Sequence, residues 1–368
     1  MSSIHEIELV EILNKFPEAV KFNEALLPAM GSESIFIAIL GFEDRCLSIP
    51  EELAKHGNHN AQKAFYFTYT TNSADNTQNK DKLLNALSEI SHEYQSVVCD
   101  TQDFPQNFRD IIKACQNAES RLKVIMDIST CSSMPLLLAI KILFEFDVDL
   151  HILYSEAKIY HPTYEEWQAE KNKHVKEEGF GIAKGVSRVF PSPEHPGDRK
   201  DNLPEKVFVF PTFKPERIIA ILHDIDPSIA LVPDKHAIWF VGKPHLKENE
   251  WRIDAIKEIN KITEDMQQVL VSTFDYKDTI RGLNAQWDKW KSDYHITIAP
   301  LGSKLQAIGI ALFWQMHQEL SMVFAVPEQY NAKQYSEKCI ERWYIPLGST
   351  REIKHLLDCV GNIELREI

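Results

Sequence analysis

IFIAILGFEDR at residues 35–45 and VFVFPTFKPER at residues 207–217 share one pattern. Each stretch begins with an uninterrupted apolar run and continues into a polar loop that ends in arginine. An unbroken apolar run of this length is typical of a strand that is buried on both faces of a parallel sheet. The two stretches therefore predict two equivalent strands, one in each half of the chain.

Similar apolar segments follow in both halves, and helix-like patterns separate them. The first series comprises 35–40, 64–69, 96–99, 123–128 and 149–154, and the second comprises 207–210, 237–241, 268–272, 295–299 and 321–326. Short buried strands that alternate with helices indicate a doubly covered parallel sheet. We therefore expect an α/β protein with two tandem Rossmann-like domains.

The two series match at an offset of roughly 172 residues, which a tandem duplication requires. The loops match as well: Phe42 to Arg45 correspond to Phe213 to Arg217, Asp103, Phe104 and Arg109 to Asp275, Tyr276 and Arg281, and Tyr160 approximately to Tyr330. The duplication thus predicts two sets of equivalent loops.

The remaining segments complete a five-part organisation. We expect a helical extension at 1–34, domains at 35–160 and 207–330, a helix and exposed linker at 161–206, and a short helical extension at 331–368. Within the last segment, 331–344 and 350–360 are expected to be helical, and IELREI at 363–368 to add an edge strand.

Composition excludes several classes of protein. A net charge of −14 disfavours extended nucleic-acid binding, which needs a broad basic face. The six cysteines form no CxxC pair and no metal-binding histidine motif occurs, so we expect reduced thiols in the cytoplasm, no bound metal and no cofactor. No secretion signal or membrane span is indicated.

Ligands of open parallel sheets bind beyond the carboxyl ends of the strands, which directs attention to the loops there. In PLGSK at 300–304, Gly302 permits a tight turn, Ser303 offers a hydroxyl and Lys304 brings charge to a helix start, which suits a phosphate. The loop is not a Walker A motif. The alternative is a capped helix with a solvated lysine.

The first half carries two comparable loops. Residues 129–133 are rich in hydroxyls around Cys131, which is a weak candidate nucleophile. GFEDR at 41–45 offers two carboxylates for a ribose or base and Arg45 for a phosphate. The alternative is that Glu43 and Asp44 complement a helix start while Arg45 pairs locally.

The recurring Asp103/Arg109 and Asp275/Arg281 pairs have identical spacing. Residues six apart do not face each other on one helix, so no direct ion pair is expected. We expect each aspartate to cap its helix and each arginine to reach a neighbouring element.

These loops supply the candidate residues. The ligand-binding candidates are Gly41, Glu43, Asp44, Arg45, Ser129, Thr130, Ser132, Arg217, Asp275, Tyr276, Gly302, Ser303 and Lys304, and the catalytic candidates are Glu43, Asp44 and Cys131.

Over residues 35 to 330 this architecture resembles the CARF and SAVED families, Rossmann-like sensors of prokaryotic immunity in which two copies bind a cyclic oligonucleotide. Those families use the loops after the first and fourth strands. The resemblance implies ligand contacts from Gly41 to Arg45, Ser129 to Ser133, Phe213 to Arg217 and Gly302 to Lys304. Residues 331–368 are too few for an effector domain, so an effector is expected to be a separate protein.

Three functions remain open. The leading hypothesis is a non-enzymatic sensor or subunit of an anti-phage defence system that binds a nucleotide second messenger between its halves. The second is an enzyme acting on a nucleotide or nucleoside, with GFEDR carboxylates as acid and base. The third is a non-catalytic assembly scaffold.

Overall fold

Two sheets organise the chain, which is represented by a computed structural model that describes residues 4–27, 29–56, 60–117, 119–172, 183–199, 202–231, 233–331 and 335–361. The first-half unit comprises Asn14–His161 and Tyr335–Cys359. The second-half unit comprises the described residues within Met1–Leu13, Pro162–Gln334 and Val360–Ile368. The strand proposed at 363–368 lies outside the described residues.

The first-half unit holds a seven-stranded sheet of order β1-β13-β6-β5-β2-β3-β4. Its strands are β1 Val20–Lys21, β2 Ser34–Ile39, β3 Lys63–Thr68, β4 Tyr94–Val98, β5 Leu122–Asp127, β6 Val148–Tyr160 and β13 Ser336–Ser349. Its helices are α2 Ser48–His56, α3 Ser73–Asn76, α4 Lys80–Ile90, α5 Phe104–Cys115, α6 Ser133–Leu143 and α14 Thr350–Gly361, with 3₁₀ turns η1 Glu24–Leu26, η2 Asp44–Cys46 and η3 Thr77–Asn79.

The second-half unit holds a six-stranded sheet of order β10-β9-β8-β11-β12-β7. Its strands are β7 Ala183–Pro196, β8 Glu205–Val209, β9 Ala237–Lys243, β10 Gln268–Ser272, β11 His295–Ala299 and β12 Ser321–Tyr330. Its helices are α1 Ile4–Leu13, α7 Tyr164–Asn172, α8 Pro215–Ile225, α9 Pro227–Leu231, α10 Pro233–His236, α11 Trp251–Ile259, α12 Tyr276–Trp290 and α13 Lys304–Met316, with 3₁₀ turn η4 Lys247–Asn249.

The α/β fold class is confirmed, and the two sheets repeat each other. All ten expected strands are present, and the five of each half pair in parallel. When the five parallel strands of each half are numbered in the order of the chain, their order across the sheet is 3-2-1-4-5. This order is familiar from dinucleotide-binding folds.

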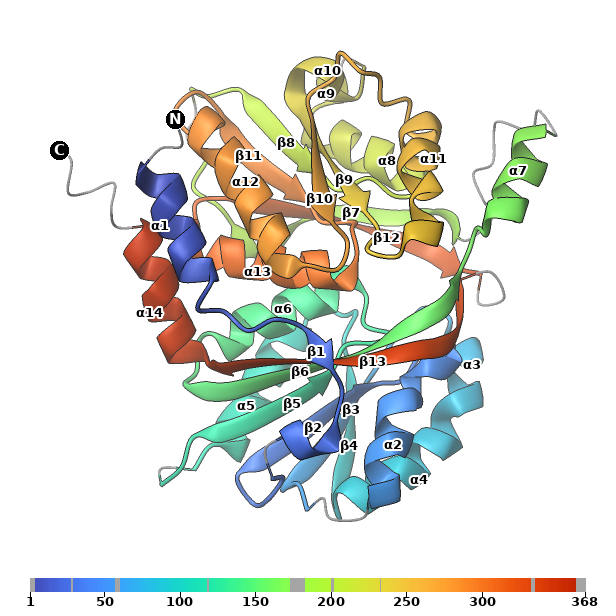
Figure 1. Ribbon diagram of the computed structural model, residues 1–368, viewed down its shortest axis with the longest axis vertical. Helices are drawn as coiled ribbons and strands as arrows, with labels where there is room; N and C mark the ends of the chain where they lie inside the picture. Colours follow the sequence, from blue (N-terminus) through green and yellow to red (C-terminus); the bar gives the residue numbers. More distant parts are fainter. Residues whose placement is uncertain are drawn as a thin grey trace. The chain divides into compact units, whose positions relative to one another are not determined.

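Successive apolar residues of a strand point to opposite faces of the sheet, and helices pack against both faces. In the first-half unit, Phe36 and Ala38 share one core cluster with residues of α2 and α4, whereas Phe67 on β3 stacks edge-on against Phe104 of α5. Figure 1 shows α2 and α4 on one side of this sheet and α5 and α6 on the other. In the second-half unit, Val207 and Val209 pack against α8 in a corresponding cluster.

Three expectations for the flanking segments were wrong. Residues 336–349, expected to be largely helical, form strand β13 antiparallel to β6. Within 161–206 the expected helix is present as α7, but the segment expected to be an exposed linker contains strand β7. This strand pairs antiparallel with β12. The amino-terminal extension contains the expected helix, α1, but Val20–Lys21 forms strand β1 with β13 within the stretch that was expected to be helical.

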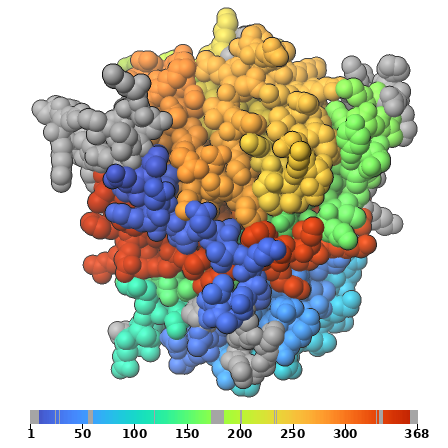
Figure 2. Space-filling view, in the orientation of Figure 1, coloured from blue at the N-terminus to red at the C-terminus, as the bar shows by residue number. Residues whose placement is uncertain are grey.

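These segments form strands because each pairs with a strand that is brought to it by the tertiary fold. β7 and β13 mix charged residues and proline with apolar ones, so their sequences lack the unbroken apolar run of the interior strands. The partners are also remote in sequence. Figure 2 shows the blue amino-terminal segment beside the red carboxyl-terminal segment, as the β1–β13 pairing requires.

The antiparallel strands are exchanged along the chain. β7 follows β6 in sequence but belongs to the second-half sheet, whereas β13 follows β12 but belongs to the first-half sheet. One residue at the same register position of β7 and of β13 has a left-handed backbone conformation: Gly185 at φ 55° and Lys338 at φ 57°. The duplication therefore extends to a sixth strand that the matching of the parallel strands did not include.

Candidate functional site

Each sheet reverses its strand order between its first and fourth parallel strands. β2 lies beside β5 in the first-half unit, and β8 lies beside β11 in the second-half unit. This reversal is where α/β sheets normally accept a ligand. We call residues 40–46 and 128–132 the first-half switch point, and residues 210–217 and 300–304 the second-half switch point.

The two loops of the first-half switch point are in contact. A Cβ added at Gly41 would lie 3.1 Å from Cβ and Oγ1 of Thr130, so glycine permits the close approach of the loops. The Thr130 hydroxyl donates to the carbonyl of Ile39 at 3.1 Å. The sequence-predicted residues Gly41 and Thr130 are thus brought together, with the threonine hydroxyl bonded to the backbone.

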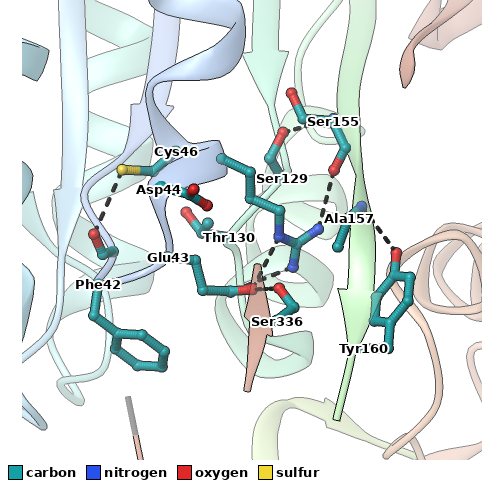
Figure 3. Close-up of polar contacts among 12 residues, drawn as sticks. Phe42, Glu43, Asp44, Cys46, Ser129, Thr130, Ser155, Ala157, Tyr160 and Ser336 are labelled. Atoms are coloured by element: carbon teal, nitrogen blue, oxygen red, sulfur yellow. Dashed lines mark hydrogen bonds and ion pairs between the residues drawn. The ribbon is translucent and has the colours of Figure 1, made fainter. Parts of the chain in front are cut away.

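Glu43 and Arg45 form a buried ion pair. Arg45 Nε donates to Glu43 Oε2 at 2.9 Å and Nη2 to Oε1 at 3.3 Å, and only 6% of Glu43 and 2% of Arg45 is exposed. Arg45 Nη1 donates to the Ser155 carbonyl of β6 at 3.0 Å. The hydroxyl of Ser336 in β13 donates to the same carboxylate (Figure 3).

The charge of Arg45 is held by this environment. Burial is the largest single influence on Arg45 and would lower its pKa, but the charge and hydrogen bond of Glu43, together with the buried Tyr154 and Tyr160, outweigh burial and raise the pKa above its ordinary value. The carboxylate and guanidinium therefore satisfy each other inside the protein. This is the local pairing that the sequence left open for Arg45.

Neighbouring groups also fix the backbone of this loop. Asp44 is exposed and accepts the Lys338 amide of β13 at 3.0 Å. The Asn79 side-chain amide donates to the carbonyls of Gly41 and Glu43 at 3.0 and 3.4 Å. The loop is therefore held by η3, β6 and β13, which are separate in sequence.

The hydroxyl-rich loop after β5 is also bonded internally. The Ser129 hydroxyl donates to Asp127 and accepts the Ser155 amide at 2.7 Å. The Ser132 amide donates to the hydroxyl of Tyr69 at 2.8 Å. Protein groups therefore satisfy the Ser129 hydroxyl and the Ser132 amide, two of the donors in the loop that was expected to cradle an anion.

The two thiols of the first-half switch point are buried. Cys131 is 1% exposed, so a substrate in solution does not reach its sulfur. Burial also raises the pKa of Cys46, in the same switch point, to about 12. A thiol with so high a pKa carries almost no thiolate at neutral pH.

The second-half switch point repeats the arginine contact with different neighbours. Arg217 Nη2 donates to the Ala325 carbonyl of β12 at 2.5 Å, as Arg45 does to β6. Lys214 is the residue that precedes α8, just as Glu43 precedes η2, and it is 8% exposed. Its ammonium lies 5.1 Å from the ring centre of Tyr330. A cation thus stands where the first half has a carboxylate.

The PLGSK loop is a capped helix start. The Ser303 hydroxyl accepts the Gln306 amide at 3.1 Å and donates to the Thr273 carbonyl at 2.6 Å, and the Gln306 side chain accepts the Ser303 amide at 2.8 Å. This reciprocal capping box satisfies donors that a phosphate would otherwise bind. Lys304 is the first residue of α13 and is partly exposed.

Gly302 brings this loop against the loop after β8. A Cβ at Gly302 would lie 3.2 Å from Phe210 and 2.4 Å from the Gln306 side-chain oxygen. The two loops therefore meet, as in the first half. Gly302, Ser303 and Lys304 are placed beside the loop that carries Arg217.

The paired aspartates and arginines behave differently in the two halves. Asp275 caps α12 by accepting the Lys277 amide at 2.9 Å, as expected, and the neighbouring Tyr276 is buried. The expected absence of a direct ion pair is wrong here, because Arg281 lies 3.1 Å from Asp275. Asp275 precedes the helix, so its side chain can extend over the first turns and meet the side chain of Arg281.

In the first half the outcome is reversed. Asp103 occupies the cap position of α5 but makes no side-chain cap hydrogen bond, so that expectation is wrong. Arg109 reaches a neighbouring element, as expected, and pairs with Glu145 at 2.6 Å.

Several important residues were not among the candidates. Lys214 was detectable, because it aligns with Glu43 when the two halves are compared. Ser336 was not, because it lies almost three hundred residues from Glu43 in a segment expected to be helical. Asn79 is an ordinary polar residue in sequence, and only the fold brings it to the loop.

The comparisons with known proteins add no identity. No protein-family model matches the chain, and no curated protein matches it. The solved structures that match include the cytoplasmic domain of a prokaryotic cation chloride cotransporter, at 6% identity and a TM-score of 0.24, with 82% of this chain and 96% of that chain covered. In the described part of the chain, no helix is long and apolar enough to cross a membrane.

Proposed function

We propose that the protein is a sensor that binds a phosphate-bearing, nucleotide-like ligand at the second-half switch point. The observation that carries this proposal is the replacement of the Glu43 carboxylate by Lys214 beside a retained arginine, Arg217. A site that has exchanged its internal anion for a cation is suited to an anion from outside.

The local charge supports an anionic ligand. On one side of this switch point Lys214 precedes α8 and Arg217 lies in the first turn of that helix, and on the other side Lys304 begins α13. The whole chain carries a net charge of −14, which repels long polyanions. A small phosphate compound meets the local cations without requiring a broad basic surface.

The contacts and burial of the candidate catalytic residues favour binding rather than catalysis. Glu43 is occupied by Arg45 and Ser336, Asp44 accepts an amide of β13, and Cys131 is buried. The buried Glu43 ion pair and the buried Cys131 thiol are therefore poorly placed to act as a general base or a nucleophile. We therefore favour a non-enzymatic sensor over a nucleotide-processing enzyme.

The biological setting is part of this proposal. It rests on the resemblance of the two strand series and their loops to the CARF and SAVED sensors of prokaryotic immunity. All six cysteines are free thiols, which fits a reducing cytoplasm. The sensor would then act on a separate effector protein.

Native mass spectrometry followed by calorimetry tests the function. The purified chain should retain, or take up from a panel of linear and cyclic nucleotides, one phosphate-bearing compound. Lys304→Ala should weaken its binding by about 1–3 kcal/mol, the value of a charge-assisted contact. Lys55→Ala, on exposed Lys55 of α2, is the control and should leave affinity unchanged. A chain that binds no compound of the panel would remove the proposal.

A further inference from the structure

The two switch-point arginines have equivalent anchors but different partners. Arg45 and Arg217 each donate through a terminal nitrogen to a main-chain carbonyl of the fifth parallel strand, Ser155 in β6 and Ala325 in β12. Arg45 also donates through Nε to Glu43. Arg217 Nε is buried and has no hydrogen-bond partner among the described residues.

An unpaired donor of a charged group is costly in the protein interior. Leaving a buried donor unsatisfied costs about 1–3 kcal/mol, and more when the group is charged. The first half avoids this cost with an internal carboxylate. The second half lacks that carboxylate because Lys214 occupies the matching position.

The sixth strands extend the comparison. Ser336 pairs in register with Tyr160, and Ala183 pairs in register with Tyr330, so these two residues hold equivalent positions. Ser336 is the residue that donates to the Glu43 carboxylate. The first half therefore has a complete internal anion site, built from Arg45 and Ser336 around Glu43, and the second half retains its arginine without the anion.

We propose that the Glu43 carboxylate marks where the ligand's anionic group binds in the other half: a phosphate held by Arg217 Nε and by Lys214. This inference rests on the proposed function and assigns the part of the ligand that this switch point recognises. A guanidinium edge prefers an anion with two oxygens, which phosphate and carboxylate groups both provide. The added Lys214 charge favours the more highly charged phosphate.

Calorimetry with inorganic pyrophosphate and with acetate tests this assignment on the full-length chain. Wild type should bind pyrophosphate and should bind acetate much more weakly. Lys214→Glu supplies the missing carboxylate within the chain, so it should weaken pyrophosphate binding on the order of 100-fold, because a like charge then faces the ligand. Arg217→Lys should weaken it about tenfold, because the paired donor geometry is lost.

Thermal unfolding separates these effects from misfolding. Lys214→Glu should unfold at or above the wild-type temperature, because the new carboxylate satisfies Arg217 as Glu43 satisfies Arg45. Lys214→Met, which removes charge without adding an anion, should have an intermediate affinity. Pyrophosphate or nucleotide binding that is lost in Lys304→Ala but unchanged in Lys214→Glu and Arg217→Lys would overturn this inference and leave the proposed function standing. No phosphate binding by wild type would overturn both.

Discussion

Glu43 is a structural side chain in the first half, and in our proposal its position marks where the second half binds an anion. Its carboxylate is buried, paired with Arg45 and bonded to Ser336 of β13. A buried ion pair gives little net stability when it is complete, but breaking it leaves an uncompensated charge. The cost of removing Glu43 should therefore be large.

Glu43→Ala should lower the free energy of unfolding by about 3–5 kcal/mol, because Arg45 would remain buried without its anion. Urea titration followed by tryptophan fluorescence measures the loss. Asp44→Asn is the matched control: its side chain is exposed, and the loss should be under about 1 kcal/mol. Equal effects of the two changes would show that Glu43 does not hold the loop.

Residue chemistry was only partly predictable from sequence. The local pairing of Arg45 was one of two alternatives that the sequence left open, whereas the two loops and their glycines follow from the repeat and from turn chemistry. The partners of Glu43 do not, because Ser336 and Asn79 reach it through tertiary structure. Whether a hydroxyl or amide is already satisfied depends on such contacts, and Ser129, Ser132 and Ser303 illustrate this.

At the scale of elements, the helices after the fourth strands begin differently. Ser303 caps α13 through a capping box, whereas Ser132 occupies the cap position of α6 without a side-chain cap hydrogen bond. The sequence carries this difference three residues after each serine, because Gln306 follows Ser303 at capping-box spacing whereas Pro135 follows Ser132.

Ser303→Ala should lower the free energy of unfolding by about 1 kcal/mol, the usual value of a helix cap. Ser132→Ala should change it by only a few tenths of a kcal/mol, since no cap hydrogen bond is lost. Chemical denaturation of both variants beside wild type provides the measurement. A larger loss in Ser132→Ala than in Ser303→Ala would contradict this assignment of the caps.

The interior strands were predictable and the outer ones were not, for a reason that lies in their surroundings. β2 and β8 are buried on both faces and therefore need unbroken apolar runs. β13 has a mixed pattern of buried and exposed residues, and its charged positions obscured it. Its pairing with β6 is a long-range choice that no local propensity determines.

At the scale of the whole chain, the exchanged sixth strands set the folding units. β7 precedes the second parallel series and completes its sheet against β12, so a boundary placed at residue 207 removes a strand. An unpaired edge such as that of β12 would then offer its backbone to other chains. Domain limits drawn from the parallel strands alone therefore cut through a sheet.

A fragment of residues 162–334 should accordingly fold better than a fragment of residues 207–330. We expect the longer fragment to unfold cooperatively and to remain monomeric, and the shorter one to aggregate through the β12 edge. Size-exclusion chromatography with light scattering and thermal unfolding distinguish the two. A monomeric and equally stable shorter fragment would show that β7 is dispensable.

In our proposal the second-half switch point accepts an anion at the position where the first half supplies its own carboxylate. The two arginines allow one measurement to test it, because Arg45 is an internal control for Arg217 in the same molecule. Nitrogen–proton NMR of the arginine Nε groups, assigned with Arg217→Lys and followed during a pyrophosphate titration, reports on both. We expect the Arg217 signal to shift and saturate while the Arg45 signal stays in place. A stationary Arg217 signal during saturable binding, or a shift at Arg45 in its place, would contradict it.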